Sequence, residues 1–183
     1  MKKYISIAVI LFVVFLIALQ PGYATDLTLN NTPTQVCFSP NGGCTVAIIS
    51  QIDKAKSEIL VQAYSFTSAS ISLHRKSPIK RPQTRYKGRN DTRQESARRE
   101  RYTSATFMAN SGIPTFIDDK HAIAHNKIMI IDKETVITGS FNFTKAAEEK
   151  NAENLLIMRN KDLAKVYIEN WYKHKEHSEP YER

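Results

Sequence analysis

The sequence has only two cysteines among its 183 residues, Cys37 and Cys44. We recognise no second cysteine or histidine pair at ligand spacing, so we predict neither a zinc site nor a metal cofactor. The cysteines flank the turn-forming segment 38–43. In an oxidising compartment they would form a disulfide, which stabilises the fold by about 2.5 kcal/mol on a chain-entropy basis. Two buried free thiols are the alternative.

The sequence also lacks a hydrophobic run long enough to span a bilayer. Its longest predominantly apolar run, residues 5–19, falls short of the roughly 20 residues that a transmembrane helix needs. Two lysines precede this run and small residues follow it, which is typical of a signal peptide over residues 1–24. We therefore expect an exported protein, periplasmic or secreted, with a single domain over residues 25–183. An uncleaved N-terminal membrane anchor is the alternative.

Acidic residues are scarce in one segment. From His74 to Arg101 there are eleven Lys or Arg and three Asp or Glu, a net charge of 11 − 3 = +8. The rest of the chain has 26 − 11 = 15 basic and 18 − 3 = 15 acidic residues, so this segment carries all the excess charge. Such charge can hold nucleic acid or an anionic lipid surface, although few aromatic residues are interleaved to stack on bases.

The hydrophobic pattern alternates between strand and helix. It predicts strands over 34–38, 59–64, 113–117, 127–131, 135–138 and 154–158, and helices over 45–56, 68–73, 96–110 and 161–173. The opening strand–helix–strand order predicts an α/β fold in which helices cover a sheet. Residues 128–131 are apolar on both faces of their strand, so we expect this strand at the centre of the sheet.

The most informative residues stand around that central strand. His125 and Lys127 lie two residues apart at its head, Asp132 closes it, and the turn Gly139-Ser140-Phe141-Asn142 follows the next strand. Residues two apart in a strand project from the same face, so the imidazole and the ammonium would point together. A nucleophile or proton carrier beside a fixed positive charge suits a phosphoryl group.

The spacing H-x-K-x4-D-x6-G-S-x-N resembles the signature of the phospholipase D superfamily. The similarity is to its single-motif members, the Nuc-type endonucleases and related secreted proteins, and runs from about Val36 to Tyr172. Matching pieces are Cys37-Phe38-Ser39-Pro40, residues 61–67 (VQAYSFT) and residues 139–147 (GSFNFTKAA). The resemblance implies a mixed β-sheet flanked by helices on both faces, with the active-site residues at one edge.

The resemblance also implies a mechanism. Single-motif members act as homodimers in which two copies of the motif meet. His125 of one chain would attack phosphorus and form a phosphohistidine, and the other chain's His125 would protonate the leaving group. Lys127, Ser140 and Asn142 would hold the non-bridging phosphate oxygens. No metal is required, so activity should survive chelators.

Two carboxylates complete the expected site. Glu153 matches the family's glutamate that hydrogen-bonds the catalytic imidazole. Without that resemblance, we would expect it to be an ordinary charged residue in contact with solvent. Asp132 is expected to support the site structurally rather than act as an acid, and an Asx-turn is an ordinary role for it. His121, His174 and His177 match no motif position, so we expect them at the surface or at the rim of the substrate site.

Residues 74–97 depart from the family. Where its members have a buried Val/Ile-rich strand, this chain has Lys, Arg, Gln and two prolines, so we expect that strand to be missing. The segment is either a long solvated loop or a stretch read out of frame, a hypothesis that the other frames of the gene would test. Three functions follow: a metal-independent nuclease, a phospholipase D acting on phospholipid head groups, or a degenerate protein disrupted in this segment.

Overall fold

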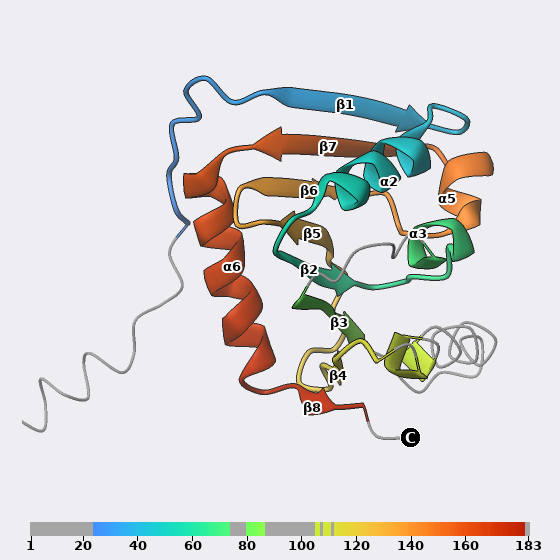
Figure 1. Ribbon diagram of the computed structural model, residues 1–183, viewed down its shortest axis with the longest axis vertical. Helices are drawn as coiled ribbons and strands as arrows, with labels where there is room; N and C mark the ends of the chain where they lie inside the picture. Colours follow the sequence, from blue (N-terminus) through green and yellow to red (C-terminus); the bar gives the residue numbers. More distant parts are fainter. Residues whose placement is uncertain (1–23, 74–79, 87–104, 107, 111, 182–183) are drawn as a thin grey trace, which may run out of the picture.

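The computed structural model describes residues 24–73, 80–86, 105–106, 108–110 and 112–181. An eight-stranded mixed sheet has the strand order β1-β7-β6-β5-β2-β3-β4-β8 (Figure 1). The strands are β1 (Thr34–Ser39), β2 (Glu58–Ala63), β3 (Lys80–Tyr86), β4 (Thr115–Ile117), β5 (Lys127–Ile131), β6 (Thr135–Gly139), β7 (Glu153–Arg159) and β8 (Glu179–Pro180). The helices are α2 (Cys44–Lys54), α3 (Ala69–Leu73), α5 (Lys145–Glu149) and α6 (Lys161–Lys175).

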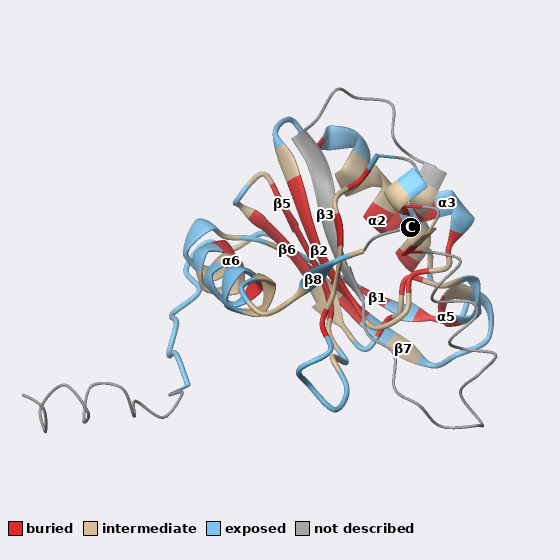
Figure 2. Cartoon of the chain, turned by 90° about the horizontal axis from the view of Figure 1, so that it is seen from below, coloured by how far each residue is buried: buried red, intermediate tan, exposed pale blue. Residues whose placement is uncertain are grey.

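Helices cover both faces of this sheet, which confirms the predicted fold class. Figure 2 shows α6 on one side and α2, α3 and α5 on the other. One core cluster joins the sheet to Ile48 of α2 and Ile71 of α3, and a second joins it to Trp171 of α6. The Trp171 indole is 1% exposed and donates a hydrogen bond to the Val61 carbonyl (3.2 Å), which ties α6 to the centre of the sheet.

The central position predicted for residues 128–131 is confirmed. Every residue of β5 is buried, and β5 lies between β2 and β6 with antiparallel pairing on both sides. Met129 and Ile131 pack into the core under α2, whereas Ile128 and Ile130 pack into the core under α6. The alternation of side chains along a strand explains why both faces of this one had to be apolar.

The expectation of a missing strand is wrong at the level of the backbone. Residues 80–86 form β3, which pairs in parallel with β2 and with β4. Backbone hydrogen bonds can form whatever the side chains are, except at Pro82, which has no N–H to donate. The register of β2 and β3 shifts between Glu58 and Leu60, because Glu58 faces Lys80 and Leu60 faces Gln83. This irregularity brackets Pro82 and is the kind of bulge that accommodates a proline.

Several expectations lie outside the described residues. These are the signal peptide over 1–24, apart from Ala24, and the basic segment over 74–101, apart from β3. The helix expected over 96–110 is described at 105–106 and 108–110, which are helical. Within the described part of the chain, no helix is both long enough and apolar enough to cross a membrane.

The two cysteines are buried free thiols that lie in contact with each other, and the disulfide between them stays a prediction. Burial, together with a hydrogen bond to Cys37, raises the pKa of the Cys44 thiol to about 12. The turn between them is held from α5 instead. The Glu148 carboxylate accepts hydrogen bonds from the backbone N–H groups of Gly43 (2.9 Å) and Thr45 (2.7 Å) and so caps the start of α2.

Candidate active site

Five of the six predicted site residues come from one edge of the sheet. Ser39, at the end of β1, faces Glu153 at the start of β7, and Gly139, at the end of β6, faces Leu155. Lys127 begins β5 opposite Ala63, the last residue of β2. The ends of β1, β2 and β6 therefore meet the beginnings of β5 and β7 at the edge that lies nearest α5 in Figure 1. The site residues leave the sheet at this edge: His125, Lys127, Ser140, Asn142 and Glu153.

Lys127 is a nearly buried cation. Its side chain is 6% exposed, and Nζ donates a hydrogen bond to the His125 carbonyl (2.8 Å). Nζ also lies 5.0 Å from the centre of the Tyr64 ring, within the range of a cation–π interaction. Burial lowers the pKa of the Lys127 ammonium to about 8, although the Glu153 carboxylate opposes the shift. The side chain therefore carries a positive charge at neutral pH in a place poor in water.

His125 is exposed and stands beside that cation. Its ring meets the Tyr64 ring edge-on, with 4.5 Å between the ring centres and 63° between the planes. Partial desolvation and the charge of Lys127 lower the pKa of His125 below its usual value, while Glu153 acts in the opposite direction. The neutral imidazole is therefore favoured at pH 7, and this is the form that can act as a nucleophile.

Glu153 acts on both of these residues through its charge. Its Oε1 atom accepts a hydrogen bond from Asn151 Nδ2 (3.1 Å) rather than the expected one from the imidazole. Its backbone N–H donates to Ser39 Oγ (3.2 Å), and that hydroxyl donates to the Asn151 carbonyl (2.9 Å). These contacts fix the start of β7 against the end of β1, so the carboxylate stays close to the His125–Lys127 pair.

The Gly-Ser-x-Asn turn depends on a glycine. Gly139 has a φ of 153°, and a Cβ atom there would lie 2.2 Å from the Asn154 carbonyl oxygen. Ser140 Oγ accepts a hydrogen bond from the Asn154 N–H (3.1 Å), so its own hydroxyl hydrogen can point outward. Asn142 Oδ1 is buried and has no hydrogen-bond partner among the described residues. Because an amide oxygen only accepts, Asn142 Nδ2 is the group that could donate a hydrogen bond to a phosphate oxygen.

This arrangement of residues is shared with known proteins. Residues 48–174 match the family described as "Cardiolipin synthase, PLD-like domain". The chain belongs to the phospholipase D superfamily. It is 38% identical over 158 residues to a phospholipase D of Rickettsia conorii, a match that covers 86% of this chain and 77% of that protein. The resemblance to the phospholipase D superfamily that the motif indicated is thereby confirmed. The protein is a phosphodiesterase.

Solved structures agree with this assignment. A phospholipase D family member, Nuc from Salmonella typhimurium, matches with a TM-score of 0.74 and 36% identity, covering 84% of this chain and 100% of that one. NucT from Helicobacter pylori matches with a TM-score of 0.64 over 82% of this chain and 100% of that one. At 20% identity, this second likeness shows a common fold.

Asp132 does not join the other members of the phospholipase D motif. It lies at the opposite end of β5 from Lys127, five residues away and thus roughly 16 Å along an extended strand. Its carboxylate accepts hydrogen bonds from the N–H groups of Lys56 (2.8 Å), Ser57 (2.7 Å) and Glu58 (3.2 Å), and from Ser57 Oγ (2.8 Å). Asp132 therefore has a structural place, as expected for it, but away from the other motif residues: it ties the β5–β6 turn to the segment before β2.

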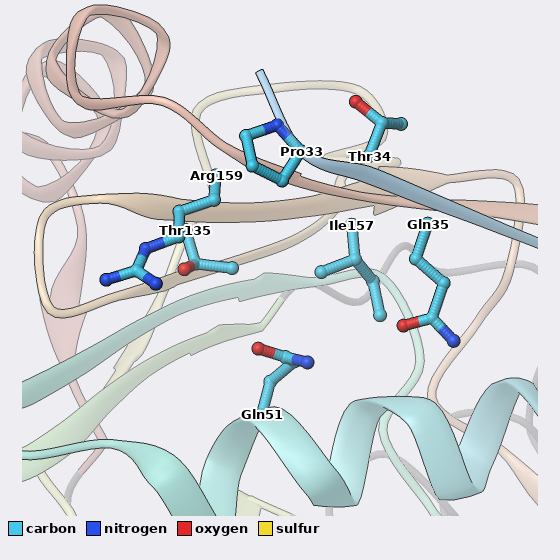
Figure 3. Close-up of a pocket in the computed structure, with 7 residues that line it drawn as sticks. All are labelled: Pro33, Thr34, Gln35, Gln51, Thr135, Ile157 and Arg159. Carbon is cyan, nitrogen blue, oxygen red and sulfur yellow. The ribbon is translucent and has the colours of Figure 1, made fainter. Parts of the chain in front are cut away.

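A pocket lies near that same end of the sheet. Figure 3 shows this pocket, which has a volume of about 280 Å³, between α2 and the strands β1, β6 and β7. Its lining residues are Pro33, Thr34, Gln35, Gln51, Thr135, Ile157 and Arg159. Thr135 begins β6 and Arg159 ends β7, whereas the motif residues stand at the other ends of these strands. The pocket is thus separate from the phospholipase D site.

Sequence reasoning missed two features of this region. Tyr64 contacts both His125 and Lys127, and its place directly after β2 in the matching piece 61–67 was the available signal. The three histidines expected at the surface or substrate rim gather around the fully buried Asp118: His121 is exposed as expected, whereas His174 and His177 are half-buried. Their signal was a repeated three-residue spacing, Asp118 to His121 and His174 to His177.

Replacing Glu153 tests the electrostatics of the site. In Glu153→Gln the negative charge that raises both pKa values is lost, so the pKa of His125 and that of Lys127 should both fall further. Heteronuclear NMR titration of the two side chains measures this. Glu149→Gln, an exposed carboxylate on α5, is the matched control and should leave both unchanged. Equal pKa values in wild type and Glu153→Gln would contradict the proposed coupling.

Replacing Asp132 tests its structural role. Burial would raise the pKa of this carboxyl, but the hydrogen bonds from Ser57, Lys56 and Glu58 outweigh burial and hold it below the usual value. Its stabilisation is therefore present at neutral pH and is lost as the pH falls through the folded-state pKa. Asp132→Asn should lower the free energy of unfolding at pH 7 by about 1–3 kcal/mol.

Chemical denaturation of Asp132→Asn at several pH values provides the measurement. The exposed Asp53 of α2 offers a matched control, because Asp53→Asn should change stability by less than about 0.5 kcal/mol. The difference between wild type and Asp132→Asn should shrink in acid. If the difference in unfolding free energy stays constant with pH, the charge of Asp132 contributes nothing to stability.

Proposed function

We propose that this member of the phospholipase D superfamily cleaves nucleic acid without a catalytic metal, through a phosphohistidine on His125. The observation that carries the proposal is the pairing of a neutral, exposed imidazole with the nearly buried ammonium of Lys127. The imidazole can reach phosphorus, and the ammonium can hold the charge that grows on the phosphoryl oxygens. In other phosphodiesterases a metal ion activates the nucleophile and stabilises the charge on the phosphoryl oxygens; here His125 and Lys127 would do so.

The reaction divides into two displacements. In the first, an imidazole nitrogen of His125 forms a bond to phosphorus while the bond to the leaving oxygen breaks, and a protonated imidazole gives that oxygen its proton. In the second, water attacks the phosphohistidine, gives a proton to the imidazole that is now neutral, and frees His125. Ser140 and Asn142, at the same edge of the sheet, would donate hydrogen bonds to the non-bridging oxygens.

The first displacement needs two imidazoles in opposite protonation states, and one motif supplies one. We propose that the second is His125 of the partner subunit in a homodimer. A two-fold axis through the site would bring the two residues to opposite sides of one phosphate. The exposure of His125 is consistent with this arrangement, because an imidazole enclosed by its own chain could not be shared.

Nucleic acid is the substrate that we favour. His125 and Ser140 are exposed, so the site is open to a polymer backbone that passes across the edge of the sheet. The whole formal net charge of +8 resides in residues 74–101, and such charge would strengthen binding to a polyanion.

Phospholipid head groups are the second candidate. Relatives from several Rickettsia species bear the name phospholipase D. In addition, Val36 and Phe38 of β1 are 51% and 66% exposed, and Phe38 precedes Ser39 at the active-site edge. Apolar side chains in this place could touch a lipid surface. Comparison of single-stranded DNA with anionic phospholipid vesicles as substrates separates the two candidates.

His125→Ala should abolish turnover of a chromogenic phosphodiester, lowering kcat by at least about 10³-fold. Wild-type turnover should continue when EDTA is added together with the substrate. Lys133→Ala is the matched control, because Lys133 is an exposed residue of the β5–β6 turn and its ion pair with Glu58 is weak. Equal turnover by His125→Ala and wild type would exclude the mechanism, and an inactive but folded wild type would favour a degenerate protein.

Mixing active and inactive subunits tests the homodimer. If both copies of His125 serve one phosphate, a dimer with a single His125→Ala subunit is inactive. After subunit exchange, an equimolar mixture should therefore retain about a quarter of the activity of the same total amount of wild type. A value of about a half would mean that each chain works alone.

We also propose that the chain is exported, with cleavage after Ala24, and that Cys37 and Cys44 become linked by a disulfide there. The contact between the two buried sulfur atoms and the leader-like sequence support this. Protein recovered from a bacterial periplasm should begin at Thr25 and weigh two hydrogens less than its reduced form by mass spectrometry. An intact N-terminus in the cytoplasmic fraction would contradict export.

A further inference from the structure

Four side chains with metal-binding atoms converge at a place that the phosphodiesterase mechanism does not use. Asp118 and His121 lie between β4 and β5, His174 lies in the last turn of α6, and His177 lies just before β8. Each offers one ligand atom, and the four atoms all lie within 4.8 Å of one another. Segments more than fifty residues apart in the sequence thus meet at one point.

The distances suit a shared ion better than hydrogen bonds alone. His121 Nδ1 lies 2.8 Å from Asp118 Oδ2, which is hydrogen-bonding distance. His174 Nδ1 lies 3.5 Å from Asp118 Oδ2 and His177 Nε2 lies 3.4 Å from Asp118 Oδ1, both longer than good hydrogen bonds. In a tetrahedral zinc site with bonds of about 2.1 Å, neighbouring ligand atoms are about 3.4 Å apart. Each of these two separations is close to that value, and a bound ion would draw the four ligand atoms, which lie within 4.8 Å of one another, onto one centre.

The charge of the cluster is also suited to a cation. The Asp118 side chain has no exposed surface, and a carboxylate in so dry a place attracts a divalent cation more strongly than one in water does. Three imidazoles and one carboxylate form a donor set for zinc or a similar divalent transition metal. Four protein ligands would leave no open position for a substrate, which is the pattern of a structural site.

We propose that Asp118, His121, His174 and His177 bind one divalent transition-metal ion that fastens the C-terminal end of α6 to the loop leading to the active site. His121 stands four residues before His125, so the ion would hold one end of the segment that carries the nucleophile. It would also anchor the chain just before β8, whose only strand partner among the described residues is β4. The ion would act on structure and leave phosphate binding to Lys127.

Metal binding can be measured without substrate and so does not rest on the proposed function. Purified protein is stripped with chelator and titrated with Zn²⁺ in equilibrium dialysis. We expect about one ion per chain and a higher melting temperature after loading. Co²⁺ loading should give visible absorption typical of a tetrahedral site. His177→Ala should lose stoichiometric binding, whereas His125→Ala, a histidine outside the cluster, should bind as wild type does.

If His177→Ala does not fold, the Co²⁺ spectrum and stoichiometry of wild type still decide the question. Wild type that binds no ion stoichiometrically and melts at the same temperature with and without Zn²⁺ would overturn the proposal. Equal binding by His177→Ala and wild type would also overturn it, because the ion would lie elsewhere.

Discussion

The antiparallel pairing of β5 with β2 on one side and β6 on the other is the constraint on which the active site depends. Because β5 is hydrogen-bonded along both edges and buried on both faces, Lys127 must begin the strand nearly buried. Burial of its ammonium costs solvation and lowers its pKa. Desolvation and the same positive charge lower the pKa of the neighbouring His125, so a requirement of the fold favours the nucleophilic form of the imidazole beside its positive partner.

Much of this arrangement could be predicted from the sequence. The run 128–131 is apolar at every position, which places it at the centre of the sheet whatever the rest of the fold is. The two-residue spacing predicted that His125 and Lys127 point together; His125 lies just before β5, and both side chains contact Tyr64. The turn after the strand 135–138 was also predicted, and the structure supplies the reason for its glycine, since a Cβ at Gly139 would collide with the Asn154 carbonyl.

Other features could not be predicted, for physical reasons. The residues of β3 have side chains that argue against a central strand, yet its backbone pairs with both neighbours. Asp132 was expected to have a structural role, but its partners lie on a segment more than seventy residues earlier and could not be named from the sequence. The histidines around Asp118 come from segments that only the folded chain brings together. The two-residue β8 is too short to produce a hydrophobic period.

The most direct test of the account is to trap the covalent intermediate. Enzyme mixed with a phosphodiester labelled on phosphorus is quenched in alkali within the first turnover, because phosphohistidine survives base, and peptides are analysed by mass spectrometry. The account predicts label on a histidine of the peptide that contains His125 and none in His125→Ala. Full turnover by wild type with no phosphohistidine trapped, or with the label on another residue, would contradict it.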